Sequence, residues 1–271
     1  SSPYSYFNLG KEEVIRNMTI EKLSEFMKRG FCSNNMDLVI VGNTPDKLEK
    51  LIESNFGDLI PGKANKRDYE LPPEIKVSKI LHRFAPDLID KVDKSRSVAQ
   101  IEIRLMAPLY NDEDSPGIAL LNYLLNYRLF KKISREHGLA YAIGSIYYSL
   151  RNYGLIFIKG SVRANSVQKA NDMIFAEFNY LANNLISDDE ISSQKSRFVL
   201  SIYKSEETSE NIVQVCQKYL DFGETNEEYL KKINAVTSEK LMELAKKYLP
   251  GSMDKPGYTL LIRDPFLSEN K

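Results

Sequence analysis

The residues that most often carry metal chemistry are scarce in this sequence of 271 residues, which holds two histidines and two cysteines. A catalytic zinc site normally takes three protein ligands, and a common pattern places two histidines and a glutamate on one helix, as in His-x-x-Glu-His. His82 and His137 stand far apart, and neither has a second histidine within helical reach. Cys32 and Cys216 form no Cys-x-x-Cys pair. We therefore expect no metal site and no bound cofactor in this chain.

Motifs for covalent catalysis and for phosphate binding are also missing from the sequence. No Gly-x-Ser-x-Gly stretch supplies a nucleophilic serine, and no glycine-rich phosphate-binding motif occurs. Carboxylates gather in runs such as 188–190 and 206–207, which are typical of solvated helix faces rather than of acid–base pairs. We expect no catalytic residue in this chain.

One segment, from Arg128 to Tyr141, combines basic residues with a tyrosine. Its sequence predicts a basic amphipathic helix that ends at Gly138, a common C-cap residue, before the chain turns directly into a strand. Two interpretations stay open. The segment is an ordinary helix-to-strand connection, or it presents a cationic helix end beside a strand tyrosine, an arrangement suited to gripping a peptide backbone.

The bulk composition argues against several classes of protein. Lys and Arg together number 37, as do Asp and Glu, and a pI near 6.7 gives no support for nucleic-acid binding. No apolar run approaches the roughly 18 to 20 residues that span a bilayer. The chain starts with neither a signal-peptide layout nor a methionine, so we expect a piece of a longer protein. The cysteines are expected to be reduced, and the compartment stays open.

Helical and extended patterns alternate along the chain, which places it in the α/β or α+β class. In the first part, the pattern predicts a helix from Thr19, a strand at 36–41 and a helix from Thr44-Pro45 to about 55. Residues 61–73, rich in Lys, Asn, Arg and Pro, predict a linker.

Downstream of this linker, the pattern predicts a complete set of strands and helices. The expected strands are 75–83, 98–106, 141–149, 155–162 and 258–263, and the expected helices are 115–125, 127–136, 166–183 and more helix up to 249. The strands 141–149 and 155–162 are typical of a hairpin. Ser187 and Glu190 fit a capping box at a helix start.

Two stretches of the chain are near copies of each other. Residues 19–23 (TIEKL) and 237–241 (TSEKL) differ at one position, and each opens an amphipathic helix that ends in basic residues. Each is followed by an apolar stretch, 38–41 and 259–262. The match is either a coincidence of a favoured helix start or a tandem duplication of a unit of about 220 residues.

Several of these segments resemble the insulinase/pitrilysin-type zinc metallopeptidases, which include mitochondrial processing peptidases and bacterial zinc proteases. The second half of such subunits carries an Arg-Leu-Phe…Arg-Glu-x-x-Gly-Leu-x-Tyr segment, similar to residues 128–130 and 138–141. The tail of the first half resembles residues 34–43, and the helix that closes the second half resembles the pattern around 234–237. The similarity extends from about 3 to 262.

The resemblance implies an α/β (α+β) fold, a two-layer half-domain with a mostly antiparallel sheet and helices packed on one face. Residues 1–66 are then the helix–strand–helix tail of a preceding half-domain. Residues 67–271 form a complete second, non-catalytic half-domain.

The resemblance also implies a function. The chain is expected to be the non-catalytic half of a zinc metalloendopeptidase and to help form the peptide-substrate chamber, while zinc and its ligands lie in an upstream half. The expected partners are that catalytic half and an extended peptide substrate, with a dimer as a further possibility; nucleic acid and a membrane segment are not expected. The alternative is a degenerate structural or assembly module with no role in proteolysis.

The arginine and tyrosine that contact substrate in this family carry over only in part. Tyr141 matches the tyrosine, whereas the arginine position falls on Ser134, and Arg135 stands one place later. One residue along an α-helix turns a side chain by about 100°. The predicted substrate-binding residues are therefore Tyr141, Arg135 and Ser134, and whether Arg135 replaces the missing arginine stays open.

Overall fold

A computed structural model describes residues 9–62 and 78–267 of the chain. The chain divides into two compact units. One comprises residues 1–72 and 205–221, and the other comprises residues 73–204 and 222–271.

The first unit is made of short helices with little buried surface. Its described helices are α1 (Glu12–Arg16), α2 (Ile20–Gly30), a 3-10 turn (Ser33–Asn35), α3 (Leu48–Phe56) and, up to residue 221, α7 (Ser209–Phe222). The predicted start of α2 is confirmed, because the side chain of Thr19 accepts a hydrogen bond from the amide of Lys22. Among the described residues of this unit, only Cys32 is buried.

Two predictions for the first unit are wrong. The helix predicted from Thr44-Pro45 begins only at Leu48, because the chain first makes a turn in which the Leu48 amide donates to the Pro45 carbonyl at 2.9 Å. The strand predicted at 36–41 is absent. A strand forms by pairing its backbone groups with a neighbouring strand, so an apolar run in the sequence is not enough to form one. Most of the predicted linker at 61–73 lies outside the described residues.

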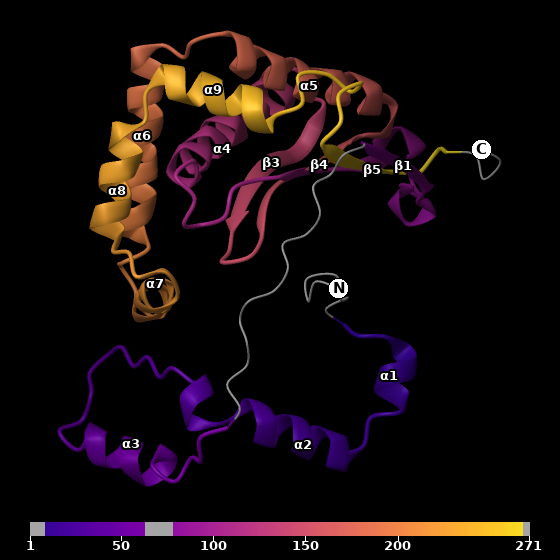
Figure 1. Ribbon diagram of the computed structural model, residues 1–271. Coiled ribbons are helices and arrows are strands. Elements are labelled where there is room, and N and C mark those ends of the chain that lie inside the picture. The colour runs from indigo at the N-terminus through magenta and orange to yellow at the C-terminus, as the bar shows by residue number, and fades with distance from the viewer. Residues whose placement is uncertain (1–8, 63–77, 268–271) are drawn as a thin grey trace. The chain divides into compact units, whose positions relative to one another are not determined.

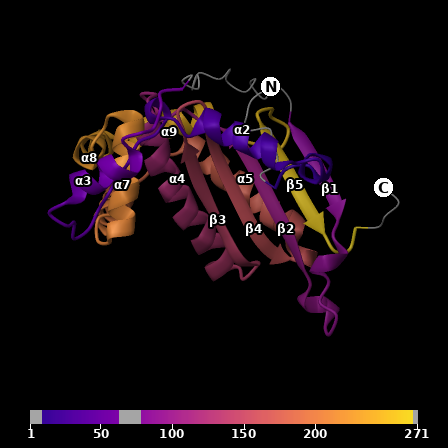
Figure 2. The same cartoon turned by 90° about the horizontal axis from the view of Figure 1, so that it is seen from below.

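The second unit contains a five-stranded sheet in the order β1-β5-β2-β4-β3 (Figure 2). Its strands are β1 (Lys79–Phe84), β2 (Val98–Met106), β3 (Ala140–Ser149), β4 (Gly154–Arg163) and β5 (Tyr258–Asp264). Only the β1–β5 pair is parallel, which confirms the mostly antiparallel sheet and the predicted hairpin. β3 forms one edge of the sheet.

Helices cover one face of this sheet, with α4, α5 and α9 lying over it (Figure 1). The helices are α4 (Ser115–Leu129), a π-helix (Phe130–Glu136), α5 (Val167–Asn183), α6 (Asp188–Lys204), α8 (Asn226–Ala235) and α9 (Ser238–Tyr248), with 3-10 turns at Pro86–Leu88, Lys94–Arg96 and Ala164–Ser166. Alternate residues of β2 point into the core that the helices close: Ala99, Ile101, Ile103 and Leu105 are fully buried. The predicted two-layer architecture is therefore confirmed.

The two helices predicted at 115–125 and 127–136 form one continuous helical segment. No proline or glycine separates them, so the α-helix continues and widens into a π-helix in its last seven residues.

The predicted capping box at the start of α6 forms only in part. The Glu190 amide donates to the Ser187 hydroxyl at 3.3 Å, but the Glu190 carboxylate accepts from Arg128 instead of closing the box. A complete box occurs at the start of α8, between Thr225 and Glu228.

Candidate functional site

Arg128, at the end of α4, is held inside the second unit by two carboxylates. Its guanidinium donates to Glu177 on α5 and to both carboxylate oxygens of Glu190 on α6, at 2.9 and 3.0 Å. Burial alone would lower the pKa of Arg128, but the two carboxylates more than offset this and raise it on balance. Lys132 also donates to Glu177, at 2.5 Å. These basic residues therefore join helices, and the cationic helix end is in part a structural feature.

Gly138 ends the helix as the sequence predicts. Its φ of 61° lies in the left-handed region, which favours glycine. The Leu139 amide donates to the Ile133 carbonyl at 2.9 Å, and the Gly138 amide donates to the Ser134 carbonyl at 3.1 Å. These two bonds cap the π-helical end of the helix, in a loop one residue wider than a Schellman motif, and the chain continues directly into β3.

The three predicted substrate-binding residues have different surroundings. The Ser134 hydroxyl donates to the Ala140 carbonyl at 2.9 Å, so it faces the start of β3. The Arg135 guanidinium lies 5.2 Å from the centre of the Phe130 ring, on its own helix. Tyr141 is 63% exposed and stands in an irregularity of the edge strand. The structure thus brings Ser134 next to Tyr141, and the substrate-binding roles of all three residues stay predictions.

The middle of the β3 edge is covered by side chains from α4. The Ser145 amide donates to the Asn126 side-chain carbonyl at 3.0 Å, and the Asn122 side-chain amide lies 3.5 Å from the Ser145 carbonyl. Because the Ser145 amide points away from β4, Ile143 and Tyr147 also direct their backbone groups to the free edge. The edge is therefore covered at Ser145, whereas the side chain of Tyr141, near the start of β3, is exposed.

Asn122 and Asn126 belong to no motif that predicts a site. Two asparagines four residues apart lie on the same face of a helix, and this spacing on a strongly apolar helix is the signal that could have indicated them. Gly144 permits the contact, since a Cβ at this position would lie 2.6 Å from the Asn126 side-chain oxygen. A neighbouring groove of about 430 Å³ follows the edge and is lined by Asn122, Tyr123, Tyr147, Phe198 and other residues.

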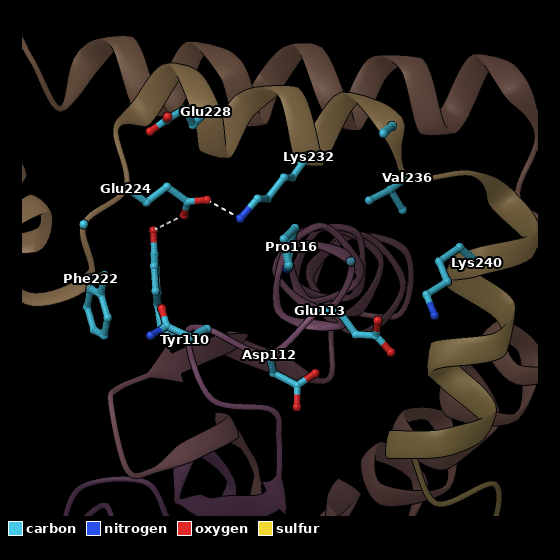
Figure 3. Close-up of a pocket in the computed structure, with 14 residues that line it drawn as sticks. Tyr110, Asp112, Glu113, Pro116, Phe222, Glu224, Glu228, Lys232, Val236 and Lys240 are labelled. Atoms are coloured by element: carbon cyan, nitrogen blue, oxygen red, sulfur yellow. Dashed lines mark hydrogen bonds and ion pairs between the residues drawn. The ribbon is translucent and has the colours of Figure 1, made fainter. Parts of the chain in front are cut away.

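A cavity of the second unit lies at the N-terminal end of α4, against α8 (Figure 3). Its volume is about 880 Å³. Glu224 accepts a hydrogen bond from the Tyr110 hydroxyl at 2.7 Å and forms an ion pair with Lys232. The Tyr110 ring stacks on Phe222 with the ring centres 3.9 Å apart. Burial, together with Glu224, raises the pKa of Tyr110, so its hydroxyl stays a hydrogen-bond donor at neutral pH.

The chemistry available in this cavity is limited. Its lining includes four carboxylates and two lysines, but no histidine, cysteine or serine: Asp112, Glu113, Glu224, Glu228, Lys232 and Lys240. Glu224 neutralises Lys232, and Lys240 pairs with Asp114 at 3.1 Å. The cavity thus offers electrostatic and apolar contacts, and its lining contains no serine, cysteine or histidine.

Residues 9–62 and 78–267 contain no group of three or more His, Cys, Asp or Glu side chains arranged to hold a metal ion. His82 contacts Asp264 at 3.0 Å across the β1–β5 pair. Cys32 and Cys216 are free thiols. In the same part of the chain, no helix has both the length and the apolar character that a bilayer crossing requires.

A sequence model of the family described as the Peptidase M16 inactive domain matches residues 17–198. The chain belongs to this family. The predicted resemblance to the insulinase-type peptidases is thereby confirmed. The match begins in the first unit and ends within α6 of the second, so the predicted boundary at 66/67 stays a prediction.

Relatives of this M16 inactive domain include two proteins of Bacillus subtilis (strain 168). The uncharacterized zinc protease YmxG is 24% identical over 247 residues, which are 88% of this chain and 57% of YmxG. The probable inactive metalloprotease YmfF is 22% identical over 263 residues, 91% of this chain and 57% of YmfF. The chain therefore spans little more than half the length of each relative.

Solved structures confirm the fold of the M16 inactive domain. A peptidase M16 inactive domain from Pseudomonas fluorescens superposes with a TM-score of 0.80 at 19% identity, over 99% of this chain and 63% of that one. A protease from Helicobacter pylori gives a TM-score of 0.78 at 17% identity, over 95% of this chain and 62% of that one.

Proposed function

We propose that this M16 inactive domain is the non-catalytic half of a zinc metalloendopeptidase. In this proposal an upstream catalytic half pairs with it, and the two halves enclose a chamber for extended peptides. The 57% coverage of YmxG, a relative named as a zinc protease, leaves room for such a half in a protein of this kind.

The observation that carries the proposal is the exposed apolar face of α2. Helices α2 and α9 each have 11 residues, and each is capped by a threonine that accepts from the amide three residues later. In α9, Leu241 is 1% exposed and Leu244 is fully buried, whereas in α2 Leu23 and Phe26 are 48% and 59% exposed. A helix of this pattern needs a covering layer, and an upstream half supplies one.

Zinc is assigned by this proposal to the upstream half. The described residues offer no group of three ligands, so they do not fit a catalytic zinc site. A zinc ion bound upstream would supply an activated water and polarise the scissile carbonyl. The contribution of this chain is to bind and orient the peptide, with the exposed Tyr141 at the start of the edge strand β3 as its contact.

The test compares the full-length protein with the 271-residue chain. Each is purified, incubated with equimolar zinc, desalted and assayed for bound zinc and for hydrolysis of a fluorogenic peptide. We expect about one zinc and chelator-sensitive cleavage for the full-length protein, and neither for the chain. Chelator-sensitive cleavage by the chain alone would overturn the proposal.

A second candidate function is an assembly module with no part in proteolysis. The residue that favours it is Ser134, which stands where the family resemblance places an arginine. The substitution Tyr141→Ala in the full-length protein separates the two functions. Loss of peptide affinity supports the peptide-binding half, and unchanged affinity with unchanged hydrolysis supports the assembly module.

A further inference from the structure

Ser134 makes two hydrogen bonds that link the end of the helix to the start of β3. The Ser134 carbonyl accepts from the Gly138 amide at 3.1 Å, and its hydroxyl donates to the Ala140 carbonyl at 2.9 Å. Ser134 therefore binds both the helix cap and the first residue of β3. These bonds fix the angle at which the strand leaves the helix.

Tyr141 is the residue that follows this contact. Ala140 pairs with Val162 and Ala142 pairs with Ser161, so Tyr141 is the extra residue of a β-bulge. Ala140 is 7% exposed, whereas Tyr141 is 63% exposed. A bulge re-aims the side chain that it carries, and here it directs Tyr141 to the surface at the free edge of the sheet.

We infer that Ser134 is a positioning residue for Tyr141. Its hydroxyl holds the Ala140 carbonyl, and with it the peptide unit that joins Ala140 to the bulge. The inference rests on the proposed binding of extended peptides at this edge. On this view Ser134 is not a replacement for the missing arginine but acts only through the tyrosine.

Arg135 does not share this role. Its side chain is exposed and lies over Phe130, so its charge is directed along the helix and not to the bulge. A matched control for a variant at Ser134 is Ser201→Ala on α6, which removes another serine hydroxyl that donates to a backbone carbonyl, that of Phe198 at 2.6 Å.

The test is a double-mutant cycle on the full-length protein, with the affinity for a fluorescein-labelled casein-derived peptide measured by anisotropy. Tyr141→Ala is expected to weaken binding about tenfold. Ser134→Ala, which loses one hydrogen bond, is expected to weaken it about three- to tenfold. In the Tyr141→Ala background, Ser134→Ala is expected to have no further effect. Ser134→Thr, which keeps the hydroxyl, should bind the peptide as the unsubstituted protein does, and the control Ser201→Ala should not change the affinity.

The outcomes distinguish peptide binding at this edge from the positioning role of Ser134. If Tyr141→Ala leaves the affinity unchanged, peptide binding at this edge is wrong, and the inference fails with it. If Tyr141→Ala weakens binding but Ser134→Ala is neutral, or equally harmful in both backgrounds, only the positioning role is wrong. Melting temperatures measured on the same variants identify any loss of affinity caused by unfolding.

Discussion

Helices α2 and α9 share their length and their cap but differ in what covers them. α9 lies on α4 so closely that a Cβ at Gly117 would come within 2.3 Å of Leu244. Within its own unit α2 keeps its apolar face exposed. The sequence pattern therefore specifies a helix and its apolar face, whereas burial of that face depends on another element of structure that packs against it.

The largest expected difference concerns two matched leucines, Leu241 and Leu23, each the fifth residue of the near-copied stretches 237–241 and 19–23. Leu241→Ala is expected to lower the free energy of unfolding of the second unit by about 2–5 kcal/mol, because it leaves a cavity in the core. Leu23→Ala should change the stability of the 271-residue chain by less than about 0.5 kcal/mol. Urea unfolding followed by circular dichroism measures both, and a cost at Leu23 above about 1 kcal/mol would break the comparison.

The same substitution at Leu23 has a different expected result in the full-length protein. If an upstream half covers α2, Leu23→Ala should there cost about 2–4 kcal/mol, close to the cost at Leu241. Thermal unfolding of the full-length variant provides the measurement. A melting temperature equal to that of the unsubstituted protein would show that α2 stays uncovered, and the proposed pairing would lose its main support.

A smaller difference comes from the carboxylate that anchors α9. Asp114 accepts from Lys247 at 2.6 Å and from Tyr248 at 3.1 Å, and it pairs with Lys240. Burial would raise the pKa of Asp114, but these hydrogen bonds lower it on balance. Lys22 of α2 corresponds to Lys240 of α9, but it donates to the backbone carbonyl of Asn17 rather than to a carboxylate.

The pKa of Asp114 is lower in the folded protein than in the unfolded chain. The ionised carboxylate therefore stabilises the fold above the ordinary aspartate pKa, near pH 4, and this stabilisation is lost as the pH falls through the pKa of the folded state. Asp114→Asn is expected to cost about 1–3 kcal/mol at pH 7 and less at pH 3. Unfolding by urea at the two pH values gives the difference. Glu243→Gln, on the exposed side of Lys240, is the control and should cost below about 0.5 kcal/mol. An Asp114 effect that grows on acidification would contradict the assignment.

The smallest expected effect comes from the threonine N-caps that α2 and α9 have in common. Thr19→Ala and Thr237→Ala each remove an N-cap hydroxyl. The hydroxyl of Thr19 accepts from the Lys22 amide at 3.3 Å, and that of Thr237 accepts from the Lys240 amide at 3.2 Å. Each should cost about 0.5–2 kcal/mol of local helix stability, since a cap acts within its own first turn. Amide hydrogen exchange in each first turn measures the two costs separately. Costs that differ by more than about 1 kcal/mol would show that the caps are not equivalent.

The sequence predicts the second unit well because local pattern and burial agree there. β2 has its predicted bounds of 98–106, and its alternating apolar residues all lie in the core. Residues 36–41 are also mostly apolar, but they form no strand, whereas β5 pairs with both β1 and β2. Hydrogen-bond partners distant in the sequence are not visible in a local pattern.

The candidate site could be predicted only where a residue type has one common use. Gly138 as a helix end follows from the need for a positive φ. The role of Arg128 could not be predicted, because its partners Glu177 and Glu190 lie on helices whose packing the sequence does not reveal. The contact of Ser134 with Ala140 could not be predicted either. It depends on the direction of the serine side chain, which is set by the π-helical turn at Phe130–Glu136.

The asparagine that closes the edge of β3 also bears on the behaviour of the protein at high concentration. An exposed sheet edge is a template on which a second molecule can add its own edge, and such zipping leads to aggregation. With the Ser145 amide already bound by Asn126, a continuous intermolecular ladder along β3 is interrupted at its centre. Gly144 permits that protection, because any larger residue would push the asparagine away. The glycine at position 144 thus helps to limit pairing between molecules along β3.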